Sequence, residues 1–204
     1  MKRDLEIHNR VGGGGKNVPQ TVVEMSAMGI EVRAARPSDV VALQAVIAAS
    51  ARSLQSGDYS AAQIEAALTR VYGVDTQLIE DGTYFAAVSG ETIVGCGGWS
   101  KHKTLFGGDH WGHREDAMLD PATDPAKIRA FFVHPDWARR GIASMLLEAS
   151  ESAAREEGFA RAELGATLTG VKFFGVRGYA VAQTTEVQIA EATTITVVRM
   201  HKML

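Results

Sequence analysis

The stretch from Ile128 to Ala143 reads I-R-A-F-F-V-H-P-D-W-A-R-R-G-I-A, and it decides how the rest of the chain is interpreted. Bulky residues on both faces of 128–133 predict a strand in the middle of a sheet. A polar turn over 134–140 follows, and a helix begins at Gly141. The first N–H groups of a helix have no partners within it, and the helix dipole adds partial positive charge. The order strand, turn, helix therefore predicts an anion site.

Two arginines stand at this helix start. Arg139 and Arg140 bring permanent positive charges to the turn, and the small residues Gly141 and Ala143 let a ligand approach the backbone closely. Together these features fit a pyrophosphate site. They fit equally well a surface turn whose arginines are solvated.

Periodicity and turn residues predict the remaining elements. An antiparallel hairpin is expected at 83–88 and 92–99, because Gly90-Glu91 turns the chain between two apolar runs. Gly158 is expected to end the helix that starts at Gly141. Residues 100–126 show no period and are expected to be a long loop. Further strands are expected at 30–34, 160–166, 179–189 and 195–203, and further helices around 40–54, 64–71 and 169–176, which makes a mixed α/β fold.

Composition excludes several classes of protein. The 204 residues fit one domain, or one domain with a tail, and 21 Lys+Arg against 24 Asp+Glu leave a net charge of −3. This balance predicts neither nucleic-acid nor membrane binding. No apolar run reaches the roughly 20 residues that span a bilayer, and the single cysteine, Cys96, cannot form an internal disulfide. We expect a soluble, cytoplasmic protein with Cys96 in its core.

Residues 1–28 are expected to be a flexible leader ahead of a domain at 29–204, because the run Gly12–Gly15 is costly to order. The leader has no apolar segment of the kind that signal peptides contain. Gly15-Lys16 does not make a phosphate-binding loop, since Asn17 stands where Ser or Thr is needed. A role of the leader in contacting a partner remains open.

The central stretch and a later one resemble the GCN5-related N-acetyltransferase family. The likeness lies in Val133-His134-Pro135-Asp136 after a strand, in Arg139-Arg140-Gly141-Ile142-Ala143 at a helix start, and in Phe173-Phe174-Gly175-Val176-Arg177-Gly178-Tyr179. The order of expected elements from Ile30 to Met203 also matches. The resemblance implies a mixed, mostly antiparallel central sheet flanked by helices.

The resemblance implies acetyl-coenzyme A as the acetyl donor. Strand backbone would pair with the pantetheine arm, turn amides would hold the pyrophosphate, and the opening between strands 128–133 and 160–166 would receive the arm. The residues implied to bind coenzyme A are Phe131, Phe132, Val133, Arg139, Arg140, Gly141, Ile142, Ala143, Ser144, Thr167 and Phe173. The side chains of Phe131 and Phe132 are expected in the core.

The implied function is direct transfer of acetyl to a primary amine of unknown identity. Two positions depart from the family pattern. Ala138 stands where the turn usually begins with Gln or Arg, and Phe174 stands where the family has its general-acid tyrosine. A phenyl ring cannot donate a proton, so an acyl-coenzyme A binding or sensing module on the same fold is the alternative. A backbone N–H near Phe132 or Val133 is expected to stabilise the oxyanion.

The general base is left open. Glu163 and His102 are the candidates, with His134 or a chain of water molecules as alternatives. Each side chain also fits a packing or surface role. The loop residues His110, His113, Asp109 and Asp116 lack the spacing of a zinc site, so no metal is expected. The closing strands, Ile189–Met203, are a candidate interface for a homodimer.

Overall fold

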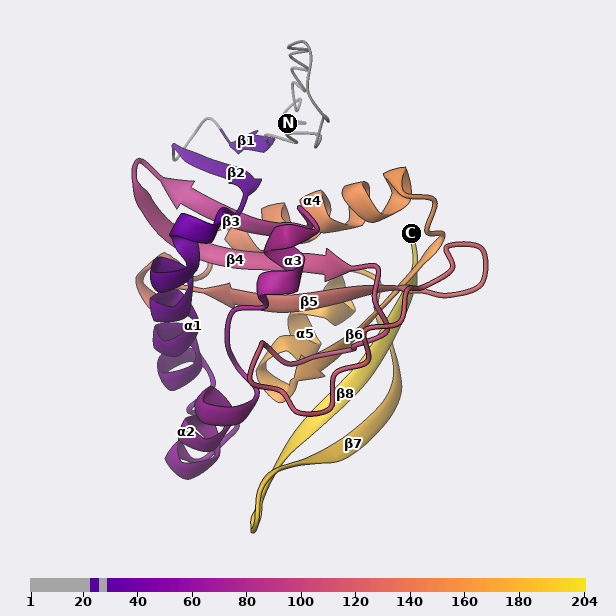
Figure 1. The fold of residues 1–204 in the computed structure, drawn as a ribbon. Helices are drawn as coiled ribbons and strands as arrows, with labels where there is room; N and C mark the ends of the chain where they lie inside the picture. Colours follow the sequence, from indigo (N-terminus) through magenta and orange to yellow (C-terminus); the bar gives the residue numbers. More distant parts are fainter. Residues whose placement is uncertain (1–22, 26–28) are drawn as a thin grey trace.

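The computed structural model describes residues 23–25 and 29–204 (Figure 1). A single sheet runs through it in the strand order β1-β2-β3-β4-β5-β6-β8-β7. The strands are β1 (Val23–Met25), β2 (Ile30–Ala34), β3 (Tyr84–Ser89), β4 (Thr92–Ser100), β5 (Ala126–Val133), β6 (Arg161–Thr167), β7 (Ala180–Ala190) and β8 (Thr193–Met203). Only β5 and β6 pair in parallel, and every other pair is antiparallel. The predicted mixed, mostly antiparallel sheet is confirmed.

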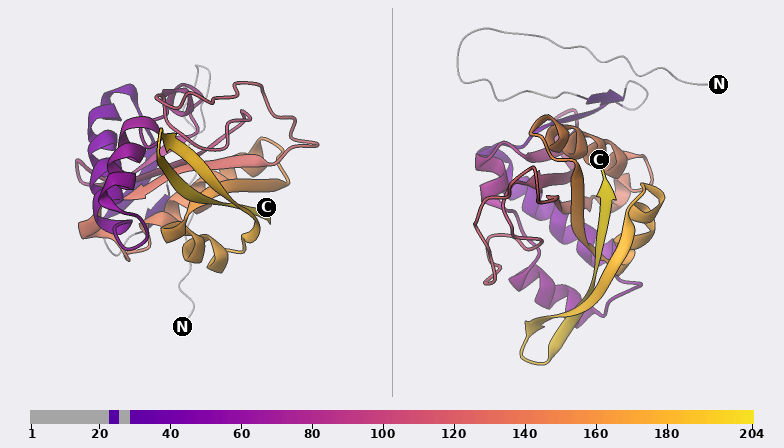
Figure 2. Two further views of the ribbon diagram at one scale, coloured as in Figure 1. Left: turned by 90° about the horizontal axis from the view of Figure 1, so that it is seen from below. Right: turned by 90° about the vertical axis from the view of Figure 1, so that its right-hand side faces the viewer.

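Helices cover both faces of this sheet, as Figure 2 (left) shows. They are α1 (Val40–Leu54), α2 (Ala61–Arg70), α3 (Thr76–Glu80), α4 (Ile142–Glu156) and α5 (Leu168–Val176), with 3-10 turns η1 (Pro37–Asp39) and η2 (Pro135–Trp137). The apolar sides of α1, α2 and α3 pack on one face, which we call the α1 face. Those of α4 and α5 pack on the other, which we call the α4 face. None of the described helices is long and apolar enough to cross a membrane.

Local sequence explains where the helices begin and end. Ser60 caps α2, since its hydroxyl accepts from the Gln63 N–H at 3.3 Å and the Gln63 side chain accepts from the Ser60 N–H at 2.9 Å. Gly158 follows α4 with a φ of 91°, as expected for a glycine after a helix. The five-residue helix α3 was not expected from the sequence, because it is too short to show an apolar period.

The long loop and the leader that the sequence predicts differ in how much of each the structure describes. Residues 101–125 form the predicted long loop between β4 and β5. Of the expected leader, residues 23–25 form β1 and pair with β2, whereas 1–22 and 26–28 lie outside the described residues. Cys96 lies on β4 and is fully buried, as expected for a core residue.

Candidate active site

The parallel strands β5 and β6 pair with each other over only three residues each. The register links Ala126 with Ala162, Lys127 with Glu163 and Ile128 with Leu164. Beyond Ile128, no residue of β5 pairs with β6 in the described chain, while β6 stays paired with β8 as far as Thr167. Backbone groups of 129–133 that face β6 therefore have no strand partner, and the two strands leave a wedge between their carboxyl ends.

A bulge in β5 lies beside this wedge. The register shifts between Cys96 and Gly98 on β4, so that Ala130 and Phe131 lie opposite Gly97 alone. Ala130 has a φ of 57°, a left-handed conformation that residues with side chains seldom adopt. A Cβ atom at Gly97 would come within 2.9 Å of the Phe131 ring. Glycine at 97 is thus what allows Phe131 to lie against β4.

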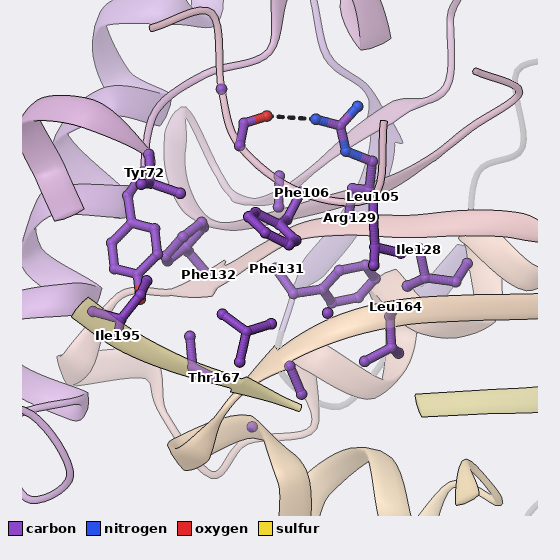
Figure 3. Close-up of a pocket in the computed structure, with 18 of the residues that line it drawn as sticks. Tyr72, Leu105, Phe106, Ile128, Arg129, Phe131, Phe132, Leu164, Thr167 and Ile195 are labelled. Atoms are coloured by element: carbon purple, nitrogen blue, oxygen red, sulfur yellow. Dashed lines mark hydrogen bonds between the residues drawn. The ribbon is translucent and has the colours of Figure 1, made fainter. Parts of the chain in front are cut away.

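A pocket of about 120 Å³ opens at the wedge (Figure 3). Its walls come from both faces of the sheet. Phe131 meets Phe174 of α5 edge to face, with 5.9 Å between ring centroids, and Phe132 meets Tyr72 in the same way at 5.6 Å. Its remaining lining residues are Gln55, Val71, Gly73, Leu105, Phe106, Gly107, Gly108, Ile128, Arg129, Ala130, Leu164, Gly165, Ala166, Thr167, Gly170, Ile195 and Val197.

A buried ion pair holds the long loop over this pocket. Arg129 of β5 lies 2.7 Å from Asp75 and donates to the carbonyl of Gly107, the dashed contact in Figure 3. Arg114, also from the loop, lies 3.1 Å from Asp75. Burial lowers the pKa of Arg129, and the neighbouring Asp75 opposes that shift. The pair therefore ties the loop and β5 together at the roof of the pocket.

The turn after β5 exposes a row of backbone N–H groups. Arg139 and Gly141 both have positive φ, 64° and 85°, and helical hydrogen bonding starts when Ser144 donates to the Gly141 carbonyl at 2.9 Å. Among the described residues, none accepts a hydrogen bond from the five N–H groups of 139–143. A Cβ at Gly141 would meet nothing within 4 Å, so the approach to this row is open. Such a row fits an anion.

Positive side chains surround the same turn. Arg139 and Arg140 are exposed, and Arg140 lies over the Trp137 ring at 4.8 Å while donating to the Asp136 carbonyl at 2.9 Å. Arg177, which sequence reasoning missed, donates to the Ser144 hydroxyl at the start of α4. Only the fold brings Arg177 to this turn, since it lies 33 residues further along the chain than Ser144.

The residues implied to bind coenzyme A lie along one path from wedge to turn. Phe131 and Phe132 line the pocket with Thr167, which directly precedes α5, and Val133 ends β5. Phe173 is half-buried and packs on Phe174 at 5.0 Å between centroids. Ile142 is buried beneath the turn, and Ala143 and Ser144 are half-buried beside it. The structure therefore places Phe131, Phe132 and Thr167 at the wedge and residues 139–144 at the turn that follows β5.

Glu163, a candidate base, lies in a buried ion-pair cluster. Its carboxylate pairs with Lys127 of β5 and accepts from the Arg199 Nε at 2.9 Å. Although burial acts to raise the pKa of Glu163, the two cations hold it below its ordinary value. A carboxylate held in this way is a poor proton acceptor at neutral pH, and Glu163 does not line the pocket.

His102, the other candidate, has both ring nitrogens engaged. Its Nδ1 lies 2.8 Å from the Asp116 carbonyl and its Nε2 lies 3.1 Å from the Asp81 carboxylate. It lies at the start of the long loop and does not line the pocket. His134 begins the turn after β5, where its Nδ1 accepts from the Asp136 N–H at 3.3 Å. None of these three residues belongs to the lining of the pocket.

The loop residues that suggested a metal have other contacts. Asp109 accepts from the Thr76 N–H at 3.0 Å, and His113 packs against Trp111 with 5.0 Å between centroids. Within 23–25 and 29–204, no three His, Cys, Asp or Glu side chains come together as a metal site.

Two polar groups of the pocket were not foreseen. Gln55 follows α1 and Tyr72 follows α2, and both are buried, with exposed fractions of 5% and 8%. Neither the Gln55 Oε1 nor the Tyr72 hydroxyl has a hydrogen-bond partner in the described chain. Neither residue belongs to a recognisable motif, so only their placement in the fold could have identified them.

Comparisons with known proteins agree with this geometry. A model described as "Acetyltransferase (GNAT) family" matches residues 49–179. Among curated proteins, none matches the sequence.

Several solved structures have the same fold. A GCN5-related N-acetyltransferase from Rhodopseudomonas palustris superposes with a TM-score of 0.64 at 23% identity, covering 85% of this chain and 94% of that one. The PaiA N-acetyltransferase from Thermoplasma acidophilum, solved in complex with coenzyme A, gives 0.60 at 15% identity over 87% of this chain and all 100% of its own. A GCN5-related N-acetyltransferase from Kribbella flavida gives 0.55 at 17% identity, covering 88% and 100% of the two chains.

Proposed function

Because the chain belongs to the GNAT family of acetyltransferases, we propose that it transfers the acetyl group of acetyl-coenzyme A directly to a primary amine. The observation that carries this proposal is the course of the chain from the β5–β6 wedge, past the end of β5 at Val133, to the N–H groups of 139–143, which have no acceptor among the described residues. A long, flexible ligand with an anion at one end and a small reactive group at the other fits such a path.

The turn supplies the site for the pyrophosphate. The five N–H groups of 139–143 have no acceptor among the described residues, and the positive end of α4 adds to the charges of Arg139 and Arg140. Arg177 lies at the same helix start through Ser144. Ala138, where the family has Gln or Arg, costs little here because backbone groups and neighbouring arginines do the binding.

The wedge supplies the site for the pantetheine arm and thioester. Successive N–H groups of a strand point to opposite sides. His134 donates to the Val94 carbonyl on β4 at 2.9 Å, so the N–H of Val133 is directed away from β4, toward the wedge. The Phe132 N–H faces Cys96 instead. Val133 is therefore the better placed of the two to stabilise the oxyanion that forms when an amine attacks the thioester.

The reaction proceeds without a tyrosine at the family's usual position. Phe174 packs among Phe131, Phe173 and Tyr179 and offers no proton. A thiolate is an acceptable leaving group, since thiols have a pKa of about 8.5. The sulfur takes its proton from the attacking nitrogen or from water.

Calorimetric titration of acetyl-coenzyme A tests the donor site. Arg140→Glu combined with Gly141→Glu places negative charge at the turn, and we expect at least about a hundredfold loss of affinity. The matched control is Gly158→Glu at the other end of α4, where φ is also positive at 91°. It should bind as the unaltered protein does.

Three outcomes separate the alternatives. Binding that the turn variant abolishes, together with acetylated amine detected by mass spectrometry, supports the enzyme. Binding without turnover on any amine supports the sensing module that Phe174 suggests. If the unaltered protein fails to bind acetyl-coenzyme A, the proposed function is wrong.

A further inference from the structure

The pocket at the wedge has two halves, one on each face of the sheet. Phe131 and Phe174 belong to the α4 face, and Phe132 and Tyr72 to the α1 face. In Figure 3, Tyr72 and Phe132 lie together at one end, whereas Ile128 and Leu164 lie at the other. The pyrophosphate turn leads into α4, so acetyl-coenzyme A reaches the wedge from the α4 face. The half on the α1 face is left for the amine.

This amine half contains two hydrogen-bonding groups without partners. The Oε1 of Gln55 and the hydroxyl of Tyr72 are buried and unpaired among the described residues. A buried polar group without a partner is destabilising, and such groups are uncommon in native proteins. Both groups can accept a hydrogen bond. A primary amine has two N–H donors, so the two acceptors match it while its lone pair stays free.

Charge in the pocket excludes a cationic amine. No Asp or Glu is present among the described residues that line the pocket, and the one charged lining residue is Arg129. The Arg129 charge is positive and is already paired with Asp75 at 2.7 Å. An ammonium group would lose its hydration here without gaining a carboxylate, which is very costly. The pocket therefore favours an amine that is neutral at physiological pH.

The rest of the amine half is apolar and small. Val71, Phe106, Phe132, Ile195 and Val197 surround the two polar groups. The two halves together measure about 120 Å³, less than the about 150 Å³ of an apolar cavity that admits one benzene-sized ring, so the acceptor can contain at most one small ring. Aromatic amines combine these properties, because delocalisation of the nitrogen lone pair into the ring makes them weak bases.

Resting on the proposed function, we propose that the acceptor is a small aromatic amine whose nitrogen is held by the Gln55 Oε1 and the Tyr72 hydroxyl. The nitrogen lone pair attacks the thioester carbonyl, a C–N bond forms and the C–S bond breaks. The nitrogen then loses one proton and the departing sulfur gains one, giving an N-aryl acetamide and free coenzyme A. Because the amine arrives neutral, the reaction needs no dedicated base to deprotonate it beforehand.

The first test compares two isomeric amines. 4-Methylaniline and benzylamine contain the same atoms, but benzylamine is an ammonium ion at neutral pH. With the full chain and acetyl-coenzyme A, we expect kcat/KM for 4-methylaniline to exceed that for benzylamine by at least about tenfold. A preference for benzylamine, or for 1,4-diaminobutane, overturns the proposal.

The second test removes each polar group while keeping the shape of the side chain. Tyr72→Phe and Gln55→Met should each raise the KM for 4-methylaniline by about five- to tenfold, with the Kd for acetyl-coenzyme A unchanged. Tyr59→Phe is the matched control, since the Tyr59 hydroxyl is already bonded to Thr196 and Leu168 and lies outside the pocket lining. It should leave both constants within about twofold.

The outcomes keep this proposal and the proposed function apart. If Tyr72→Phe and Gln55→Met leave the KM of the amine unchanged, the assignment of these residues is wrong. If they instead alter the preference between acetyl- and longer acyl-coenzyme A, the pocket holds the acyl chain and the proposal is overturned. In both cases acetyl-coenzyme A still binds and the proposed function stands. A protein that binds no acetyl-coenzyme A would overturn both.

Discussion

At Tyr59 the buried hydroxyl accepts from the Leu168 N–H at 2.8 Å and donates to the Thr196 carbonyl at 2.7 Å. Tyr59→Phe leaves the Leu168 N–H without its partner, and we expect the free energy of unfolding to fall by about 1–3 kcal/mol. Tyr72→Phe removes a hydroxyl that has no partner, so stability should stay the same or rise. Urea unfolding of the two variants measures the difference. Equal losses in both would contradict the hydrogen-bonding described.

Glu163 makes a second prediction at the scale of one residue. Its pKa in the folded protein lies below the ordinary 4.5, so its ion pairs add stability above that pH, and this stability is lost as pH falls below it. Glu163→Gln leaves Lys127 buried without its carboxylate and should cost about 3 kcal/mol at neutral pH. Urea titrations at neutral and acidic pH should show a smaller loss in acid. An undiminished loss in acid would contradict this contribution of the ion pairs. If the variant instead kept its stability and lost the pH dependence of its activity, Glu163 would be supported as a base.

Individual residues differed in how far the sequence could identify them. Arg139, Arg140 and Gly141 are recognisable because the anion site proposed for them depends on a local order of strand, turn and helix. Gln55 and Tyr72 are not, because they reach the pocket only through the packing of α1 and α2 on the sheet. Binding residues that come together only through contacts between distant parts of the sequence cannot be identified before the fold is known.

The element that matters most is the start of α4, and it allows a matched comparison. Gly141 and Gly158 flank this helix with similar φ values of 85° and 91°. Alanine at either position adopts a left-handed conformation, which costs about 1–2 kcal/mol. Only Gly141 lies beside the five unpaired N–H groups. Calorimetry should therefore show about tenfold weaker acetyl-coenzyme A binding for Gly141→Ala alone. Equal affinities in the two variants would count against a site at this turn.

Elements with a clear period were predicted well, and those without one were not. The apolar stripe of 142–156 and the alternation of 30–34 correspond to α4 and β2. The apolar pattern of 128–133 does not place the bulge at Ala130, since its conformation depends on pairing with β4 across Gly97, and a bulge in this strand was expected only from the family resemblance. This bulge and the early end of β5–β6 pairing shape the wedge, so periodicity predicted the strand, whereas the opening between 128–133 and 160–166 was expected only from the family resemblance.

For the whole molecule, β5 and β6 are joined by three residue pairs, as few as join the edge strand β1 to β2 and fewer than join any other neighbouring strands. A ligand that bonds to β5 within the wedge and contacts α5 would bridge the two halves. At a concentration of 100 times its Kd, acetyl-coenzyme A should stabilise the protein by about 2.7 kcal/mol. For a chain of this size, that corresponds to a rise in Tm of roughly 5–11 °C. Thermal scanning of the protein with and without ligand measures the shift.

The Arg140→Glu, Gly141→Glu variant is the control for this thermal shift. Its Tm should not respond to the same concentration of acetyl-coenzyme A. A shift that persists in the variant would mean that the ligand binds elsewhere on the molecule.

The burial of Cys96 has a practical consequence. Cys96 lies on β4 in the hydrophobic core of the α1 face, and burial raises the pKa of its thiol to about 12. The thiolate is the reactive form of cysteine, and the sequence contains no cysteine besides Cys96. A disulfide reagent of the Ellman type should therefore not react with the native protein. Every equivalent of chromophore released during turnover would then report one molecule of free coenzyme A. A slow release of chromophore in the absence of any amine would instead measure the rate at which the core opens and exposes Cys96.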